Sequence, residues 1–190
     1  MLDAWLRALV ATPGLTAIEY LDEARRVLLE DSLRGALLIR DLEGPLVDVG
    51  SGGGAPGIPL AFTLPAREVT LLDANRRKCN FLREWAPPNA AVVEGRAEEQ
   101  ETDCYGVAVA KALAPPPVAA ELCLPLVRPG GTAVLWVGPT ADADHVARVA
   151  VRLAAELLPS PPGFFVLRKL GPTPQGFPRR TGVARKRPLG

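Results

Sequence analysis

Residues 48–57 read Asp-Val-Gly-Ser-Gly-Gly-Gly-Ala-Pro-Gly and separate a short apolar stretch from one with helical spacing. Gly50 and Gly52 flank Ser51. Because glycine has no Cβ, the chain can turn there and bring backbone N–H groups close to a ligand. A strand, a glycine loop and a helix in this order are typical of nucleotide-binding α/β folds, whose ligands lie at the carboxyl ends of the strands. A plain glycine turn is the alternative interpretation.

Two aspartates bear on which nucleotide such a loop would bind. Asp48 comes two residues before Gly50. A dinucleotide pyrophosphate would repel a carboxylate there, whereas the cationic sulfonium and ammonium groups of S-adenosylmethionine would tolerate it. Asp73 ends the next apolar run, where it can accept hydrogen bonds from both ribose hydroxyls of S-adenosylmethionine or of NAD. It could instead cap a helix that begins near Asn75. The pattern favours S-adenosylmethionine and leaves NAD as an alternative.

A third landmark is the sequence Gly95-Arg96-Ala97-Glu98, which follows the third predicted strand. In a fold of this kind the loop lies over the adenine, where Ala97 offers a flat apolar contact and backbone groups reach the edge of the base. Glu98 has a second interpretation as an acidic residue at the start of a helix.

Short apolar runs alternate with helical segments from Gly44 onward. Runs such as VTLLD and TAVLWV are apolar almost throughout, which indicates strands buried on both faces of a parallel sheet between two layers of helices. The strands are predicted at Pro45–Val49, Glu68–Asp73, Ala90–Glu94, Gly106–Ala110, Gly131–Val137 and Gly163–Lys169. The helices are predicted at Gly57–Leu64, Asn75–Trp85, Val118–Val127 and Asp142–Leu158. The expected fold is a doubly wound, mostly parallel α/β domain.

The two ends of the chain differ from this middle part. Apolar residues at helical spacing predict a helix before Thr12, and Thr16 with Glu19 reads as the capping box of a second one. Seven basic residues and no acidic one follow Leu167, and the last 20 residues suggest an extended basic tail that binds phosphates or is simply solvated. We expect a single domain with a helical segment 1–44, a core 45–170 and a tail 171–190.

Composition restricts the class of protein. The 190 residues carry a net charge of +1 and 48% hydrophobic residues, which is ordinary for a globular domain. No apolar stretch is long enough for a membrane helix, and the N-terminus does not read as a signal peptide. The three cysteines are widely separated, which argues against a disulfide framework or a zinc site and suits a reducing cytoplasm. We therefore expect a cytoplasmic protein without a metal.

Five stretches together resemble the bacterial RsmG (GidB) family, from about residue 27 to the end. They are DVGSGGGAPGIPLA, VTLLDANRRKCNFLREW, GRAEE, GVAVAKALAP and FPRRTGVARKRPL. The resemblance implies a class I, Rossmann-like methyltransferase that uses S-adenosylmethionine to methylate guanine N7 in 16S ribosomal RNA, free or in the small-subunit particle. It places cofactor contacts at Gly50, Ala55, Ala97 and Glu98. Ser51 and Gly52 of the glycine loop and Lys111 at the end of the fourth strand are further candidate cofactor contacts. Asp73 takes the ribose role that is general to the fold.

The chain departs from the family pattern at several positions. Lys111 stands where the family usually has arginine, which exchanges a two-pronged donor for a single rotating charge. Leu28 replaces a histidine and Val137 replaces a lysine. The N-terminal region is shorter, and one strand before Phe164 is expected to be missing. Lys111 is expected to face the cofactor and the incoming base, with a positioning role.

No residue reads as a catalytic base, which fits guanine N7, because its in-plane lone pair attacks without deprotonation and needs only alignment and exclusion of water. The polar-Pro-Pro-aromatic motif of exocyclic amine methylation is absent, and Cys104 and Cys123 read as packing residues rather than the nucleophile of pyrimidine C5 methylation. Two alternatives stay open. One is a non-catalytic or retargeted member of the fold that binds S-adenosylmethionine and RNA, and the other is an NAD-linked oxidoreductase.

Overall fold

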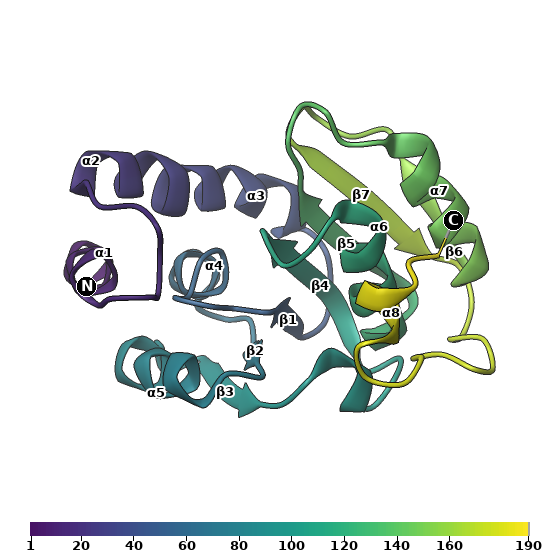
Figure 1. The fold of residues 1–190 in the computed structure, drawn as a ribbon, viewed down its shortest axis with the longest axis horizontal. Helices are drawn as coiled ribbons and strands as arrows, with labels where there is room; N and C mark the ends of the chain where they lie inside the picture. The colour runs from purple at the N-terminus through teal and green to yellow at the C-terminus, as the bar shows by residue number, and fades with distance from the viewer. Residues whose placement is uncertain (190) are drawn as a thin grey trace.

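The computed structural model describes residues 1–189 and contains a seven-stranded sheet in the order β3-β2-β1-β4-β5-β7-β6 (Figure 1). Neighbouring strands from β3 to β5 are parallel, and β7 is antiparallel to both β5 and β6. The strand order reverses between β1 and β4, which creates the crevice where ligands bind in such sheets. The strands are β1 Leu46–Val49, β2 Val69–Asp73, β3 Ala90–Glu94, β4 Tyr105–Lys111, β5 Val127–Trp136, β6 Ala155–Leu158 and β7 Phe164–Lys169.

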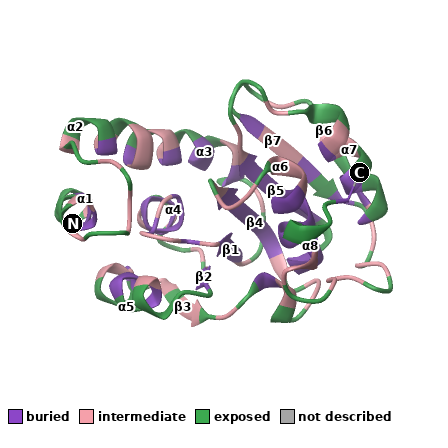
Figure 2. Ribbon diagram, in the orientation of Figure 1, coloured by how far each residue is buried: buried purple, intermediate pink, exposed green. Residues whose placement is uncertain are grey.

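Helices cover both faces of the sheet, as the apolar strands predicted. Side chains alternate along β4, so that Val107 and Val109 join one core while Ala108 and Ala110 join the other. The first core packs under α1, α3, α4 and α5, and the second under α6, α7 and α8 (Figures 1 and 2). The helices are α1 Leu2–Ala11, α2 Leu21–Ala24, the π-helical η1 Arg25–Glu30, α3 Asp31–Ile39, α4 Gly57–Thr63, α5 Arg76–Trp85, α6 Pro116–Cys123, α7 Ala143–Arg152 and α8 Val183–Lys186, with short 3₁₀ turns η2 Ala97–Glu99 and η3 Leu124–Leu126.

The N-terminal segment packs on the sheet beside the glycine loop. The Trp5 indole is fully buried, and its Nε1–H donates to the Gly53 carbonyl at 2.9 Å. The predicted capping box is wrong: the Thr16 hydroxyl accepts the Ile18 N–H at 3.1 Å in a local turn, and the helix begins only at Leu21. Such a local hydrogen bond between a threonine side chain and the backbone two residues on competes with helix formation and favours a turn.

Two other boundaries differ from the prediction. The helix expected over residues 142–158 ends at Arg152, Ala154 takes a φ of 53°, and the following residues form β6. The late strand that was expected to be missing is therefore present. The sequence Ala-Glu-Leu-Leu is compatible with a helix, and pairing with β7 decides for a strand. The helix expected over residues 118–127 ends at Cys123, and Val127 already belongs to β5.

The C-terminal segment is not the extended tail that its composition suggested. It contains α8, and Ala184 and Leu189 are buried. The Lys169 ammonium is fully buried and contacts the Asp103 carboxylate, the Leu124 carbonyl and the Thr173 hydroxyl. Apolar packing and internal ion pairs thus hold part of the basic segment against the domain.

Candidate active site

The glycine loop turns tightly between β1 and α4. The N–H groups of Gly50 and Ser51 both donate to the Leu72 carbonyl on β2, at 2.8 and 3.0 Å, and Gly54 N–H donates to the Ser51 carbonyl at 2.7 Å. Gly50 has a φ of 73°, and a Cβ on it would lie 2.4 Å from Cδ1 of Leu113 in the loop after β4. The positive φ favours glycine at this position, and any Cβ there would also displace the Leu113 side chain.

Asp48 lies beneath this loop, fully buried at the end of β1. Its Oδ2 accepts the Gly57 N–H at 3.0 Å at the start of α4, while Oδ1 has no hydrogen-bond partner among residues 1–189. Burial raises the pKa of Asp48 to about 7, and the nearby charge of Asp73 reinforces this, whereas the Gly57 N–H and the nearby Ser51 hydroxyl, which donates to the Asp48 backbone carbonyl, oppose it. Asp48 lines neither of the cavities described below, so its role is to hold the start of α4. That its charge favours S-adenosylmethionine over a dinucleotide stays a prediction.

Asp73 lies at the end of β2 with its carboxylate at the edge of a cavity. Oδ2 accepts the Gly52 N–H at 2.9 Å and Oδ1 accepts the Asn75 N–H at 2.8 Å, next to the α5 cap that the Asn75 side chain forms. Each carboxylate oxygen has a second lone pair. Asp73 therefore holds the glycine loop in place and still offers two acceptor positions to a ribose.

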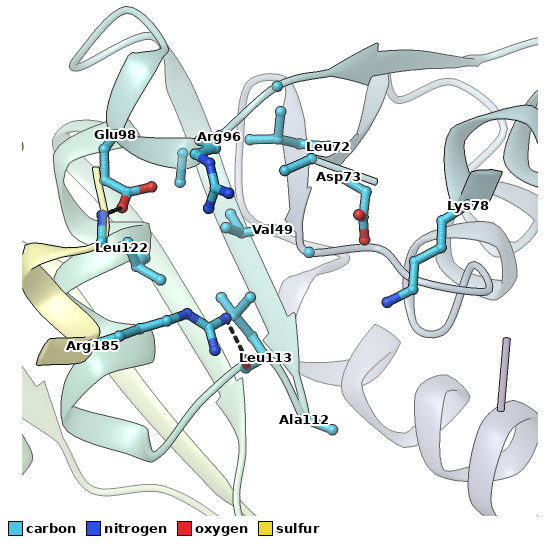
Figure 3. A pocket seen from close by; sticks show the side chains of 15 residues that line it. Val49, Leu72, Asp73, Lys78, Arg96, Glu98, Ala112, Leu113, Leu122 and Arg185 are labelled. Carbon is cyan, nitrogen blue, oxygen red and sulfur yellow. Dashed lines mark hydrogen bonds between the residues drawn. The ribbon is translucent and has the colours of Figure 1, made fainter. Parts of the chain in front are cut away.

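The first cavity encloses about 210 Å³ between the carboxyl ends of β1 to β4 and the C-terminal segment (Figure 3). Asp73 points into it from the end of β2 and Glu98 from the loop after β3, and the buried Ala97 supplies an apolar wall. The Glu98 carboxylate also accepts the Gly182 N–H at 2.9 Å. The loop that was predicted to lie over an adenine borders this cavity, and its acidic side chain also anchors the C-terminal segment.

A second cavity of about 230 Å³ adjoins the first and shares Gly50, Lys78 and Ala112 with it. The glycine loop forms one wall through Ser51, Gly52, Gly53 and Ala55, and the N-terminal segment forms the opposite wall through Leu9, Leu15, Thr16 and Leu28. The predicted site residues therefore divide between the two cavities, with Gly50 common to both. Asp73, Ala97 and Glu98 belong to the first, and Ser51, Gly52, Ala55 and Lys111 to the second.

Lys111 lines the second cavity, but its charge is already paired. The ammonium donates to the Val27 carbonyl at 2.6 Å and forms an ion pair with the Asp31 carboxylate, and the side chain is only 11% exposed. Leu28 lines the same cavity, so two departures from the family pattern meet there. Lys111 thus borders this cavity with its charge neutralised by Asp31, and the expectation that it faces the cofactor and the incoming base stays a prediction. The third departure, Val137, packs against the core and lines neither cavity.

Several lining residues were missed in the sequence. Lys78, Arg96 and Arg185 line the first cavity, and Figure 3 shows all three around it. Lys78 and Arg96 form no side-chain hydrogen bond or ion pair within residues 1–189. In the sequence, only their short separation from the predicted site residues Asp73 and Ala97 pointed to a place near the site. Arg185 belongs to the segment that composition described as a tail, so nothing local connected it with a cavity.

The remaining chemistry-bearing residues lie elsewhere. Cys123 is buried in α6 as predicted, whereas Cys104 is exposed, so its interpretation as a packing residue is wrong. Within the described residues, no three His, Cys, Asp or Glu side chains gather as metal ligands would. None of the helices in this part of the chain is both long and apolar enough to cross a membrane.

Comparison with known proteins identifies the family. Residues 4–155 match the GidB family, described as rRNA small subunit methyltransferase G. The chain belongs to this family. The protein named ribosomal RNA small subunit methyltransferase G of Synechococcus elongatus is 37% identical over 85% of this chain and 76% of its own length. The protein of the same name from Thermotoga neapolitana is 36% identical over 97% of this chain and 89% of its own length.

Solved structures agree on the fold. A SAM-dependent O-methyltransferase from Thermotoga maritima matches with a TM-score of 0.60 and 16% identity, over 86% of this chain and 74% of its own. The 16S rRNA N2 G1207 methyltransferase RsmC of T. thermophilus, solved with AdoMet and guanosine, matches with a TM-score of 0.56 and 14% identity, over 73% of this chain and 38% of its own. The chain is thus a class I methyltransferase in fold, and its family uses S-adenosylmethionine as cofactor. Family membership removes the NAD-linked alternative.

Proposed function

We propose that the chain transfers the methyl group of S-adenosylmethionine to N7 of a guanine in 16S ribosomal RNA, in the cytoplasm. One observation carries the choice of N7: none of the residues that line the second cavity is Asp, Glu or His. Guanine N7 has an in-plane lone pair and needs no general base, whereas an exocyclic amine loses a proton on methylation. The family and the names of its relatives support ribosomal RNA of the small subunit as substrate.

The first cavity fits the adenosine part of the cofactor. Asp73 offers acceptor positions for the ribose hydroxyls, and Ala97 and Glu98 border the place of the adenine. Gly50, where a Cβ would meet Leu113, leaves room for close backbone contact. The cofactor supplies an electrophilic methyl group when bound. Ser51, Gly52 and Ala55 then border the passage to the second cavity, into which the base enters.

The protein's part in the reaction is alignment. Leu9, Leu15 and Leu28 give the second cavity an apolar wall that excludes water and holds a flat base against the glycine loop. Lys111 and its partner Asp31 fix this wall to the end of β4, so Lys111 acts as a positioning residue. Lys78 and Arg96, without internal partners among the described residues, are placed to meet RNA phosphates near the first cavity.

The second candidate is a member that binds cofactor and RNA without methylating the usual base. The neutralised Lys111 and the apolar Leu28 favour it, because both stand in the cavity for the base where the family has other residues. The two candidates differ in their product and not in cofactor binding.

Nucleoside analysis of 16S ribosomal RNA tests the proposal. Cells that lack the gene should lose one 7-methylguanosine per 16S molecule, and the unmodified gene should restore it. Asp73→Ala should weaken cofactor binding by about 1–3 kcal/mol through lost hydrogen bonds to a charged group and restore much less. An unchanged 7-methylguanosine content in the deletion strain would refute the proposed reaction, and normal binding of S-adenosylhomocysteine in that case would support the second candidate.

A further inference from the structure

Residues 179–189, here called the C-terminal strap, form part of the wall of the first cavity. Gly182 and Arg185 line this cavity together with the glycine loop and the loop after β3. Gly182 N–H donates to Glu98 at 2.9 Å, and the Thr181 hydroxyl donates to Glu99 at 3.0 Å. The strap therefore joins the loop that borders the adenine position at two consecutive residues.

Buried contacts hold the strap in this place. The Arg179 guanidinium forms two hydrogen bonds with the Glu121 carboxylate on α6, at 2.5 and 2.6 Å, and the Glu121 side chain is 3% exposed. Arg179 also donates to the Arg187 carbonyl at 2.9 Å, which closes the strap on itself. Leu189 is buried and its carbonyl lies 2.7 Å from Nε2 of His145 on α7. An ion pair of this kind fixes a segment, because separating it would leave a buried charge without a partner.

Arg185 reaches from the strap to the loop after β4, which also lines the first cavity. Its Nη2 donates to the Leu113 carbonyl at 3.0 Å, in the loop after β4 (Figure 3). The Leu113 side chain in turn packs where a Cβ on Gly50 would stand. Arg185 thus connects the strap with the loop after β4 and, through Leu113, with the glycine loop. The other four N–H donors of its guanidinium have no acceptor among residues 1–189.

We propose that Arg185 is a cofactor-binding residue that closes the adenosine side of the first cavity and contacts the purine ring. A planar guanidinium stacks on aromatic rings and donates to ring nitrogens in its plane. Arg185 shares the wall of the first cavity with Leu113, Ala97 and Glu98, which brings it to the purine end, whereas Ser51 and Ala55 line only the second cavity. This inference rests on the proposed placement of adenosine in the first cavity.

Calorimetric titration of the full chain with two probes tests the inference. S-adenosylhomocysteine carries the whole cofactor skeleton, whereas 5′-methylthioadenosine lacks the amino-acid part. Arg185→Ala should weaken the binding of both probes by the same factor, roughly tenfold, as expected for the loss of a charged contact. Arg185→Lys should recover part of the loss. Lys186→Ala, next to it on the exposed side of α8 and outside both cavities, should bind both probes within twofold of the unmodified protein.

Three outcomes would overturn the inference. Equal affinities for Arg185→Ala and Lys186→Ala would show that the strap does not contact the cofactor. A loss confined to S-adenosylhomocysteine would place Arg185 at the amino-acid part instead of the purine. If the unmodified protein binds neither probe, the proposed function fails and the inference fails with it. Because Arg185 is exposed, the thermal midpoint of Arg185→Ala should equal that of Lys186→Ala, which separates lost binding from lost folding.

Discussion

At the scale of single residues, Asp48 shows how burial changes the meaning of a side chain. A carboxyl with one oxygen on the Gly57 N–H and the other without a partner is favoured in its protonated form, since ionisation would place a charge in the core. Burial accordingly raises its pKa from 3.8 to about 7. Its strand-end position before the glycines was visible in the sequence, but not its depth below the loop, because depth depends on how Gly57 and Leu71 pack around it.

This pKa predicts a dependence of stability on pH. As the pH rises above about 4, Asp48 ionises in the unfolded chain but stays protonated in the folded one until about pH 7. The folded state then holds more protons, so the free energy of unfolding falls over this interval, by at most about 1.4 kcal/mol per pH unit from this group. Asp48→Asn should remove that contribution.

Urea unfolding at pH 4.5, 5.5, 6.5 and 8 measures the effect as the difference between the unmodified protein and Asp48→Asn. The difference should move in favour of the variant up to about pH 7 and stay constant above it. A difference that does not change with pH would mean that Asp48 keeps its ordinary pKa in the folded protein.

At the scale of elements, the strands were the most predictable part. β2 and β4 are buried on both faces, and long apolar runs such as VTLLD have few other uses in a domain of this size. The errors fell where two local structures suit the same residues. Ala155–Leu158 could extend α7 as well as form β6, and Thr16 could cap a helix as well as close a turn. Pairing with β7 decided for a strand in the first case, and the hydrogen bond from the Ile18 N–H decided for a turn in the second.

The ion pair between Lys111 and Asp31 joins β4 to α3 beside the second cavity, and it leads to a prediction about stability. The Lys111 and Asp31 side chains are only 11% and 30% exposed, so both charges have lost part of their hydration. The attraction between them compensates this loss. Lys111→Ala and Asp31→Asn should each reduce the free energy of unfolding by about 1–3 kcal/mol. The double variant should lose less than the sum of the single variants, because the interaction is lost only once. Additive losses in denaturant unfolding would show that the two residues act independently.

The same pair also predicts the behaviour of Lys111→Arg. A guanidinium can hold the Asp31 carboxylate through two parallel hydrogen bonds, so the variant should keep or raise both stability and methyl transfer. A drop in methyl transfer at unchanged stability would show that the single ammonium is required at the cavity. Lys111→Ala should lower turnover more than the affinity for S-adenosylhomocysteine, since Lys111 supports the wall for the base.

At the scale of the whole molecule, the distribution of charge was evident in the sequence but its use was not. Composition placed seven cations after Leu167, and the structure commits Lys169 and Arg179 to internal acidic partners. Which cations would stay exposed depends on Asp103 and Glu121, which are far away in sequence. Two of the exposed ones are Arg180 and Arg187, on the strap.

If these two side chains contact phosphates, they contribute to the salt dependence of RNA binding. Replacing Arg180 and Arg187 by glutamine should reduce the slope of log affinity against log salt concentration by about 0.7–0.9 for each phosphate contact that is lost. Arg148 and Arg152 on α7, which line neither cavity, make a matched pair whose replacement by glutamine should leave the slope unchanged. Equal slopes for both double variants would leave the strap without a role in binding phosphates.

The central claim is that the protein methylates guanine N7 in the second cavity, without a general base to remove a proton. It is tested most directly by transfer of a labelled methyl group to 16S ribosomal RNA containing either guanosine or 7-deazaguanosine. Both RNAs are assayed free and reassembled into small-subunit particles. The deaza base keeps the shape and the exocyclic amine of guanine but replaces N7 by a C–H group, which has no in-plane lone pair. We predict one methyl group per guanosine-containing RNA and none on the deaza RNA, although both bind the protein equally well. Methylation of the deaza RNA would contradict the assignment of N7 as the acceptor.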